Sequence, residues 1–205
     1  MKFKFLIIGI ISAAAGIISY FLIDGVMASV ALIFLMILAL FFFVLEYYEY
    51  EKNPKDYEET VLCYILKDDE VLMLKRKEDK EDINSNKWMG VGGHLELNES
   101  PDDCVLREVK EETGLTLTSY DLLGQIKFYY NNKYTEKIYV YAGYEAKGEF
   151  IPCDEGELKF IKKDDIYNLP MWEGDKLFLK PLLDNKKFKC SLYYENDKLI
   201  NYKIK

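Results

Sequence analysis

Three glutamates in one short stretch are the residues of this sequence best suited to do chemistry. Glu108, Glu111 and Glu112 lie three and four positions apart, so on a helix their carboxylates emerge on one face, about 5 to 6 Å apart. Their repulsion costs only a few tenths of a kcal/mol on an exposed helix, but about 4 kcal/mol at a separation of about 4 Å in a partly enclosed site. A bound cation removes that repulsion, and oxygen ligands suit Mg²⁺ or Mn²⁺ better than Zn²⁺. The alternative is a solvated acidic helix face, which is the commoner meaning of such a run.

The spacing around the glutamates favours the metal site. Five residues separate Gly93 from Glu99, seven more separate Glu99 from the pair Arg107 and Glu108, and the run ends at Gly114 and an aliphatic residue. This pattern resembles the Nudix box, G-x5-E-x7-R-E-U-x-E-E-x-G-U with U aliphatic, at every defined position. The chain is therefore identified as a member of the Nudix hydrolase family. The resemblance implies an α/β (α+β) fold in which a mixed β-sheet is sandwiched between helices.

The resemblance also implies a role for each residue of the box. The expected ligands of Mg²⁺ or Mn²⁺ are Glu108, Glu111, Glu112 and the carbonyl of Gly92. The expected structural residues are Gly93, Glu99, Arg107 and Gly114, with Arg107 pairing with Glu99 to hold the loop on the helix. In this family water attacks a phosphorus atom while metal ions polarise the phosphate, and a carboxylate takes the proton. Two residues are candidates for that general base, Glu111 and Glu155, and the sequence leaves the choice open.

A second resemblance extends toward the C-terminus. The stretch NLPMWEGD, which ends at Asp175, resembles the Nudix subgroup that hydrolyses oxidised purine nucleoside triphosphates. In that subgroup a tryptophan stacks on the base and aspartates bind its edge, which implies these roles for Trp172 and Asp175. Stacking of this kind contributes about 1 to 3 kcal/mol per base. The alternative for Trp172 is an anchor that fixes a loop to the core. The further substrate contacts considered are Thr60, Arg76 and Met89.

Two positions depart from that subgroup. Gly174 stands where a second aspartate is common, and Met89 stands where an asparagine reads the base. A site discriminates between bases through buried hydrogen bonds, and this chain lacks two of the polar side chains that would form them. These departures put selectivity for 8-oxoguanine in question. His94, the only histidine, follows the glycines beside the site. An exposed loop residue is the favoured interpretation of His94, and a phosphate contact is the alternative.

The elements that position these residues can be traced along the chain. A helix from Pro101 to Thr113 is predicted, because Ser100 suits its N-cap and Gly114 its C-cap. The other expected elements are a hairpin of strands 60–67 and 70–76, a glycine-containing loop 88–94, strands 122–130, 136–145 and 158–161, a helix 174–183 and a hairpin 188–204.

The first 45 residues differ from the rest of the chain. Residues 5–23 and 26–45 are apolar runs separated by Asp24-Gly25, and each is long enough to cross about 30 Å of hydrocarbon. We therefore expect a transmembrane hairpin in residues 1–45, a juxtamembrane tether in 46–57 and a Nudix domain in 58–205. Basic residues flank the hairpin but are missing from its turn, which places the N-terminus and the Nudix domain on the cytoplasmic side of a membrane. A cleaved signal peptide and a buried helical hairpin are the alternatives.

Charge and cysteine content restrict the classes of partner and the kinds of metal or disulfide site that we expect. The formal net charge of −8 argues against a nucleic-acid partner. The four cysteines have no paired spacing, so neither a zinc site nor a disulfide framework is expected. The expected partners are a nucleotide or other diphosphate substrate and a lipid bilayer around residues 5–45.

The leading functional hypothesis is a Mg²⁺-dependent pyrophosphohydrolase. It would cleave a nucleoside triphosphate, including an oxidised purine such as 8-oxo-dGTP, to the monophosphate and pyrophosphate. One alternative is a Nudix hydrolase of another nucleoside diphosphate-linked compound. The other is a membrane-anchored sensor that binds a nucleotide without cutting it.

Overall fold

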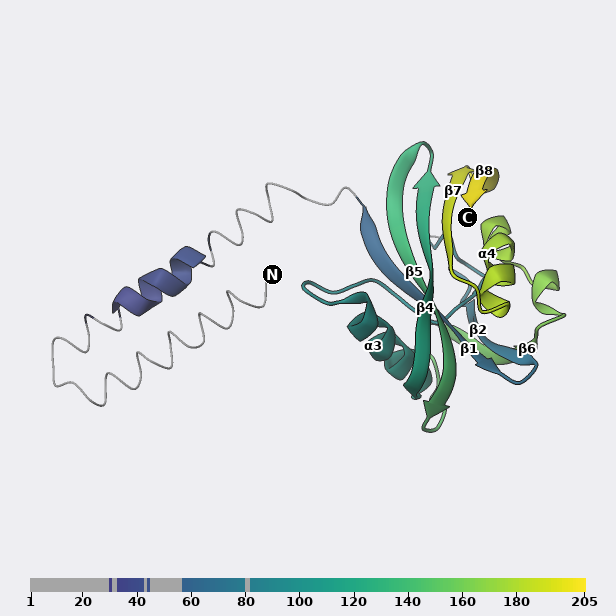
Figure 1. The fold of residues 1–205 in the computed structure, drawn as a ribbon, viewed down its shortest axis with the longest axis horizontal. Helices are drawn as coiled ribbons and strands as arrows, with labels where there is room; N and C mark the ends of the chain where they lie inside the picture. The colour runs from purple at the N-terminus through teal and green to yellow at the C-terminus, as the bar shows by residue number, and fades with distance from the viewer. Residues whose placement is uncertain (1–29, 31–32, 43, 45–56, 80–81) are drawn as a thin grey trace. The chain divides into compact units, whose positions relative to one another are not determined.

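The computed structural model describes residues 30, 33–42, 44, 57–79 and 82–205 (Figure 1). The compact unit Asp56–Lys205 contains every residue of the expected site. Its strands are β1 (Glu58–Lys67), β2 (Glu70–Arg76), β3 (Trp88–Met89), β4 (Thr116–Tyr130), β5 (Lys133–Lys147), β6 (Gly156–Lys162), β7 (Phe188–Glu195) and β8 (Lys198–Ile204). Its helices are α3 (Pro101–Thr113), the short 3-10 helix η1 (Ile166–Asn168) and α4 (Glu173–Leu183).

One mixed β-sheet forms the centre of this unit. Its strands follow the order β3-β2-β1-β5-β4-β7-β8, and β6 pairs with β2. The pairs β1–β5 and β4–β7 are parallel, whereas the hairpins β1–β2, β4–β5 and β7–β8 are antiparallel. The expectation of a mixed sheet is confirmed.

The two main helices cover opposite faces of the sheet (Figure 1). On one face, α3 buries Cys104, Val105 and Val109 in an apolar cluster with residues of β1 and β5. On the other, α4 buries Phe178, Leu179 and Leu182 in a second cluster with residues of β4 and β7. Burial of apolar area stabilises both layers by roughly 25 cal/mol per Å². The predicted arrangement, a mixed sheet between helices, is confirmed.

Local interactions set both ends of α3. The Ser100 hydroxyl accepts a hydrogen bond from the backbone N–H of Asp103 at 3.1 Å. Gly114 follows the helix with φ of 78°, a left-handed conformation that glycine adopts without strain, and its N–H donates to the Lys110 carbonyl. The predicted helix bounds are confirmed, so the three glutamates lie on one helix.

The glycine loop after β3 lies along the N-terminal half of β1. The N–H of Val61 donates to the Gly93 carbonyl at 2.9 Å, and the N–H of Cys63 donates to the Val91 carbonyl at 2.7 Å. A Cβ on Gly92 would lie 2.0 Å from the Val61 carbonyl oxygen, so only glycine permits this close approach. The loop thereby reaches the glutamates of α3.

The strands β4 and β5 extend beyond the predicted ranges 122–130 and 136–145. They include Thr116 to Asp121 and continue to Lys147. Register shifts in the β4–β5 ladder let the pairing run on through polar residues that the alternation pattern did not mark as strand.

The predicted membrane localisation is contradicted. In the part of the chain that the structure describes, no helix is long and apolar enough to span a bilayer. Most of the expected hairpin 5–23 and 26–45, and most of the tether 46–57, lie outside the described residues.

Candidate active site

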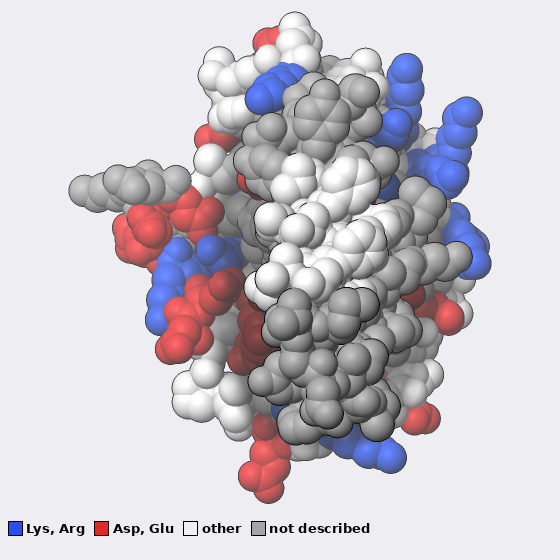
Figure 2. Space-filling model, turned by 90° about the vertical axis from the view of Figure 1, so that its left-hand side faces the viewer, with Lys and Arg blue, Asp and Glu red and all other residues white. Residues whose placement is uncertain are grey.

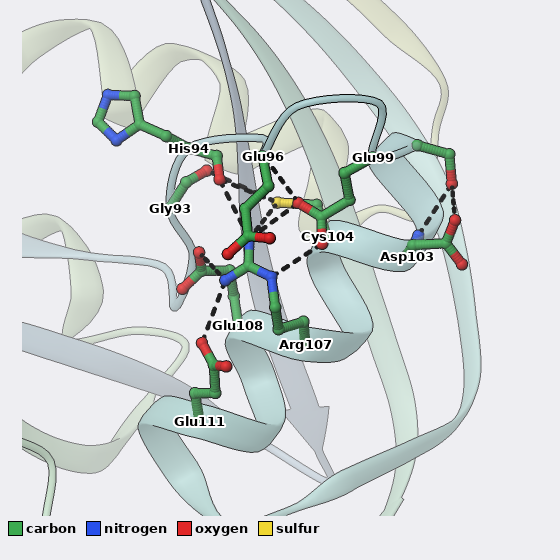
Figure 3. A network of polar contacts seen from close by, with 10 residues as sticks. Gly93, His94, Glu96, Glu99, Asp103, Cys104, Arg107, Glu108 and Glu111 are labelled. Carbon is green, nitrogen blue, oxygen red and sulfur yellow. Dashed lines mark hydrogen bonds and ion pairs between the residues drawn. The ribbon is translucent and has the colours of Figure 1, made fainter. Parts of the chain in front are cut away.

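Arg107 is the centre of a polar network between α3 and the glycine loop (Figure 3). Its guanidinium donates to both carboxylate oxygens of Glu99, at 2.8 and 2.9 Å, and to the carbonyl of His94 at 3.1 Å. Its third nitrogen donates to Glu108 at 2.7 Å and to Glu111 at 3.1 Å. One arginine therefore ties the loop to α3 and holds two of the three glutamates.

This network shifts the proton affinities of its members. Hydrogen bonds from Arg107 lower the pKa of Glu99 to about 2. Burial raises the pKa of Glu108, although Arg107 acts in the opposite direction. The Glu108 side chain is mostly buried, whereas that of Glu111 is 60% exposed.

Glu112 is the buried member of the three glutamates. Its Oε2 accepts a hydrogen bond from the backbone N–H of Gly92 at 3.0 Å, and its Oε1 is buried without a hydrogen-bond partner. Burial and the neighbouring carboxyl of Glu155 raise the pKa of Glu112 to about 9. A buried oxygen without a partner costs about 1 to 3 kcal/mol, so this position calls for a cation or a donor.

The donor set fits a hard divalent cation. It consists of carboxylate oxygens on one helix face, beside a glycine loop that exposes backbone groups. As they stand, however, no three His, Cys, Asp or Glu side chains of the described residues converge closely enough to hold a metal ion. Two of the glutamates are turned onto Arg107 instead.

Arg76 and Glu155 lie on the other side of Glu112. Arg76 donates to Asp82 at 3.1 and 3.0 Å and forms an ion pair with Glu155. The charge of Glu112 also acts on Arg76. The structure therefore brings both residues close to Glu112 on α3, with Arg76 already paired to carboxylates.

A pocket of about 230 Å³ opens next to this cluster. All five predicted substrate contacts line it, namely Thr60, Arg76, Met89, Trp172 and Asp175. Of the box residues and base candidates, Gly92, Gly93 and Glu155 also line it. The pocket therefore runs from the glycine loop to the start of α4.

Trp172 is 8% exposed and closes one wall of the pocket. Its indole N–H donates to Asn84 at 2.8 Å, and the Lys87 ammonium lies 4.3 Å from the ring centroid. The rings of Tyr194 and Phe128 meet it nearly at right angles. The residue thus combines a pocket-lining position with the anchoring contacts of the alternative interpretation.

Asp175 is the least exposed charged residue that lines the pocket. It is 9% exposed, and burial together with the charge of Glu136 raises its pKa to about 7, while Lys87 acts to lower it. Glu136, on β5, accepts a hydrogen bond from the Thr60 hydroxyl at 2.6 Å and also lines the pocket.

Sequence reasoning missed Glu136, Asn84 and Lys87. Alternation along β5 places Glu136 on the same face as Ile138, which was a usable signal. That signal could not show which strand lies beside β5. The contacts of Asn84 and Lys87 with Trp172 depend on a loop 85 to 88 positions away and had no local signal.

Packing explains the departure at Gly174. A Cβ there would lie 2.6 Å from Leu192 and 2.8 Å from the Tyr194 hydroxyl, which accepts a hydrogen bond from the Gly174 N–H. A side chain at this position would require the side chains of Leu192 and Tyr194 to move. Their packing therefore favours glycine over a second aspartate.

The NUDIX domain matches residues 56–182. The chain belongs to the Nudix family. Its geometry, with the box on α3 and the loop along β1, agrees with that membership, and the protein is a Nudix hydrolase.

Relatives of this Nudix hydrolase span most of its folded unit. An oxidized purine nucleoside triphosphate hydrolase from Danio rerio is 27% identical over 128 residues, which cover 61% of this chain and 81% of that protein. An uncharacterised Nudix hydrolase from Bacillus subtilis, YvcI, is 30% identical over 119 residues, covering 55% of this chain and 71% of that protein. A crystal structure of a MutT protein from Bacillus halodurans matches with a TM-score of 0.63 and 28% identity, covering 72% of this chain and 97% of that one.

Outside the pocket, acidic and basic side chains occur together on the surface of this Nudix hydrolase. Figure 2 shows Asp and Glu side chains beside Lys and Arg side chains on the face in view. His94 also lies at the surface: its side chain is 68% exposed, and its Nε2 lies 2.9 Å from the Glu58 carboxylate. That placement agrees with an exposed loop histidine, although His94 also borders the pocket.

Proposed function

We propose that this Nudix hydrolase is a Mg²⁺-dependent pyrophosphohydrolase that converts a nucleoside triphosphate, including an oxidised purine, to the monophosphate and pyrophosphate. One observation carries the proposal: a single pocket joins the glycine loop and Glu155 to Trp172 and Asp175. Phosphates at the first end and a base at the second would bring the phosphoanhydride next to the glutamates of α3.

The likeness to relatives supports the substrate class. The Danio rerio relative is named an oxidized purine nucleoside triphosphate hydrolase, and so is a Mus musculus relative that is 23% identical over 147 residues. Four apolar side chains, Met89, Phe128, Ile138 and Leu192, supply walls suited to a flat base.

The metal would be held by Glu108, Glu111, Glu112 and the carbonyl of Gly92. When bound, Mg²⁺ supplies charge that polarises the phosphate and neutralises its oxygens. The unpartnered Oε1 of Glu112 supports this assignment. Arg107 orients Glu108 and Glu111 by hydrogen bonds and is a positioning residue.

A carboxylate of this chain takes the proton from the attacking water. Glu111 is exposed and held only by Arg107, and Glu155 lines the pocket and pairs with Arg76. Both stay candidates, since each is a carboxylate beside Glu108 or Glu112. General-base help contributes about 10² to 10⁴ in rate.

A substrate panel tests the proposed function. The full chain is incubated with Mg²⁺ and, separately, with 8-oxo-dGTP, dGTP, dATP, a nucleotide sugar and a dinucleotide, and the products are separated by chromatography. We expect a nucleoside triphosphate to give the monophosphate and pyrophosphate, with loss of turnover in EDTA. Preferred cleavage of the sugar or dinucleotide would replace this proposal with the alternative hydrolase. Thermal stabilisation by nucleotide without any product would replace it with a nucleotide sensor.

A further inference from the structure

Two carboxyl groups line the pocket, and neither forms an ion pair among the described residues. Asp175 comes from the first turn of α4 and Glu136 from β5, and both line the pocket. Among the ion pairs of the described residues, neither carboxyl takes part. An ion pair normally offsets the cost of burying a charged group. We therefore expect a bound ligand to supply the partner of these two carboxyl groups.

Their contacts leave acceptor oxygens facing the pocket. Glu136 accepts one hydrogen bond, at its Oε1, from Thr60 at 2.6 Å. The Asp175 side chain has no hydrogen bond within the described part of the chain, although it is 9% exposed. The two negative charges also repel, which contributes to the raised pKa of Asp175. A ligand that donates hydrogen bonds to both groups would relieve that repulsion.

The walls around the carboxyls define the shape of such a ligand. Trp172 and Phe128 are aromatic, and Ile138 and Leu192 are aliphatic. The Lys87 ammonium lies over the ring of Trp172, and the carboxyl groups of Asp175 and Glu136 line the same pocket. The ligand is therefore flat and apolar on its faces, with N–H donors along one edge.

We infer that Glu136 is a specificity-determining residue, which together with Asp175 accepts hydrogen bonds from the adjacent ring N–H and exocyclic amino group of a guanine-type base. An adenine-type base presents a ring acceptor beside its amino group, and that acceptor faces a carboxylate oxygen unfavourably. The inference rests on the proposed function in that the ligand is a nucleotide. It adds a residue of β5 to the contacts that the sequence indicated.

The test measures binding rather than turnover. Calorimetry on the full chain compares dGMP with dAMP for the wild type, Glu136→Gln and the matched control Glu145→Gln, an exposed glutamate of the same strand. In Glu136→Gln the amide oxygen still accepts from Thr60, but its NH₂ group opposes the donors of guanine. Hydrogen bonds to charged groups are worth about 1.5 to 3 kcal/mol, so we expect the preference for dGMP to fall at least tenfold in Glu136→Gln. The control should keep the wild-type preference.

Several results would overturn the inference. An unchanged dGMP preference in Glu136→Gln would do so, and so would a wild type that prefers dAMP or binds neither nucleotide. If Glu136→Gln does not fold, Thr60→Val removes the hydrogen bond that positions the carboxyl and should lower the preference in the same direction. A wild type that binds dGMP selectively but cleaves no nucleoside triphosphate would support this inference while overturning the proposed function.

Discussion

The two ends of the pocket treat their carboxylates in opposite ways. At the α3 end, Arg107 donates to Glu99, Glu108 and Glu111, and the pKa of Glu99 falls to about 2. At the α4 end, Asp175 has no such partner and its pKa rises to about 7. The guanidinium of Arg107 therefore favours the ionised form of the carboxyl groups at the α3 end. At the α4 end, burial favours the uncharged form of the Asp175 carboxyl. The first end is organised before ligand arrives, and the second depends on what the ligand supplies.

The largest effect is expected at the α3 end, from loss of the general base. Glu111→Gln and Glu155→Gln keep the shape of each side chain but remove its ability to take a proton. We expect turnover to fall about 10² to 10⁴-fold in whichever variant loses the base, and at least a hundredfold in Glu111→Gln if Glu111 has that role. Steady-state kinetics with Mg²⁺ measures it. Glu157→Gln, an exposed position on β6, serves as the control. Near-full activity in both test variants would contradict the assignment.

The next effect concerns stability at the α4 end. The pKa of Asp175 is raised from 3.8 to about 7, so between these pH values the folded state binds more protons than the unfolded state. Stability from this group is complete below about pH 4 and is lost as the pH rises through about 7. At about 1.4 kcal/mol per unit of pKa shift, the loss reaches about 4 kcal/mol.

Asp175→Asn removes that pH dependence. Urea unfolding of wild type and variant at a series of pH values from about 4 to 8 should show the variant gaining stability relative to the wild type as the pH rises. The matched control is Asp154→Asn, an exposed position outside the pocket. Parallel stability curves for wild type and Asp175→Asn would show that burial does not raise this pKa.

A smaller effect separates stacking from anchoring at Trp172. Trp172→Leu keeps an apolar side chain but removes the aromatic face. If the residue stacks on a base, binding of dGMP should weaken by about 1 to 3 kcal/mol, or roughly 5- to 150-fold, with little change for inorganic pyrophosphate. Calorimetry with both ligands makes the distinction. Equal weakening of both would instead indicate a general disturbance of the fold, as expected for a loop anchor.

The smallest effect is expected from Arg107→Lys. Lysine keeps the charge but cannot make the paired hydrogen bonds to Glu99, so we expect a loss of about 1 kcal/mol and a melting temperature lower by about 2 to 4 °C. Differential scanning calorimetry measures the shift. Lys162→Arg, the converse exchange at an exposed residue of β6, is the control. No shift in Arg107→Lys would mean that the network of Figure 3 contributes little to stability.

The α3 end was readable from sequence because its interactions are local. Ser100 and Gly114 cap the helix through contacts within four residues, and the box lies in one continuous segment. The N-terminal apolar runs show the limit of the same approach. Hydropathy and length predicted a membrane location, whereas no helix among the described residues is long and apolar enough to span a bilayer.

Composition and local spacing thus determined the family, the capped helix and the succession of strands along the chain. Tertiary structure decided which side chains meet in the pocket: the parallel β1–β5 pairing sets Thr60 against Glu136, and β7 fills the space beside Gly174. The physical reason is distance along the chain. Capping and helix-face spacing depend on neighbours within about one turn, whereas strand pairing joins residues more than 70 positions apart and depends on how the whole core packs.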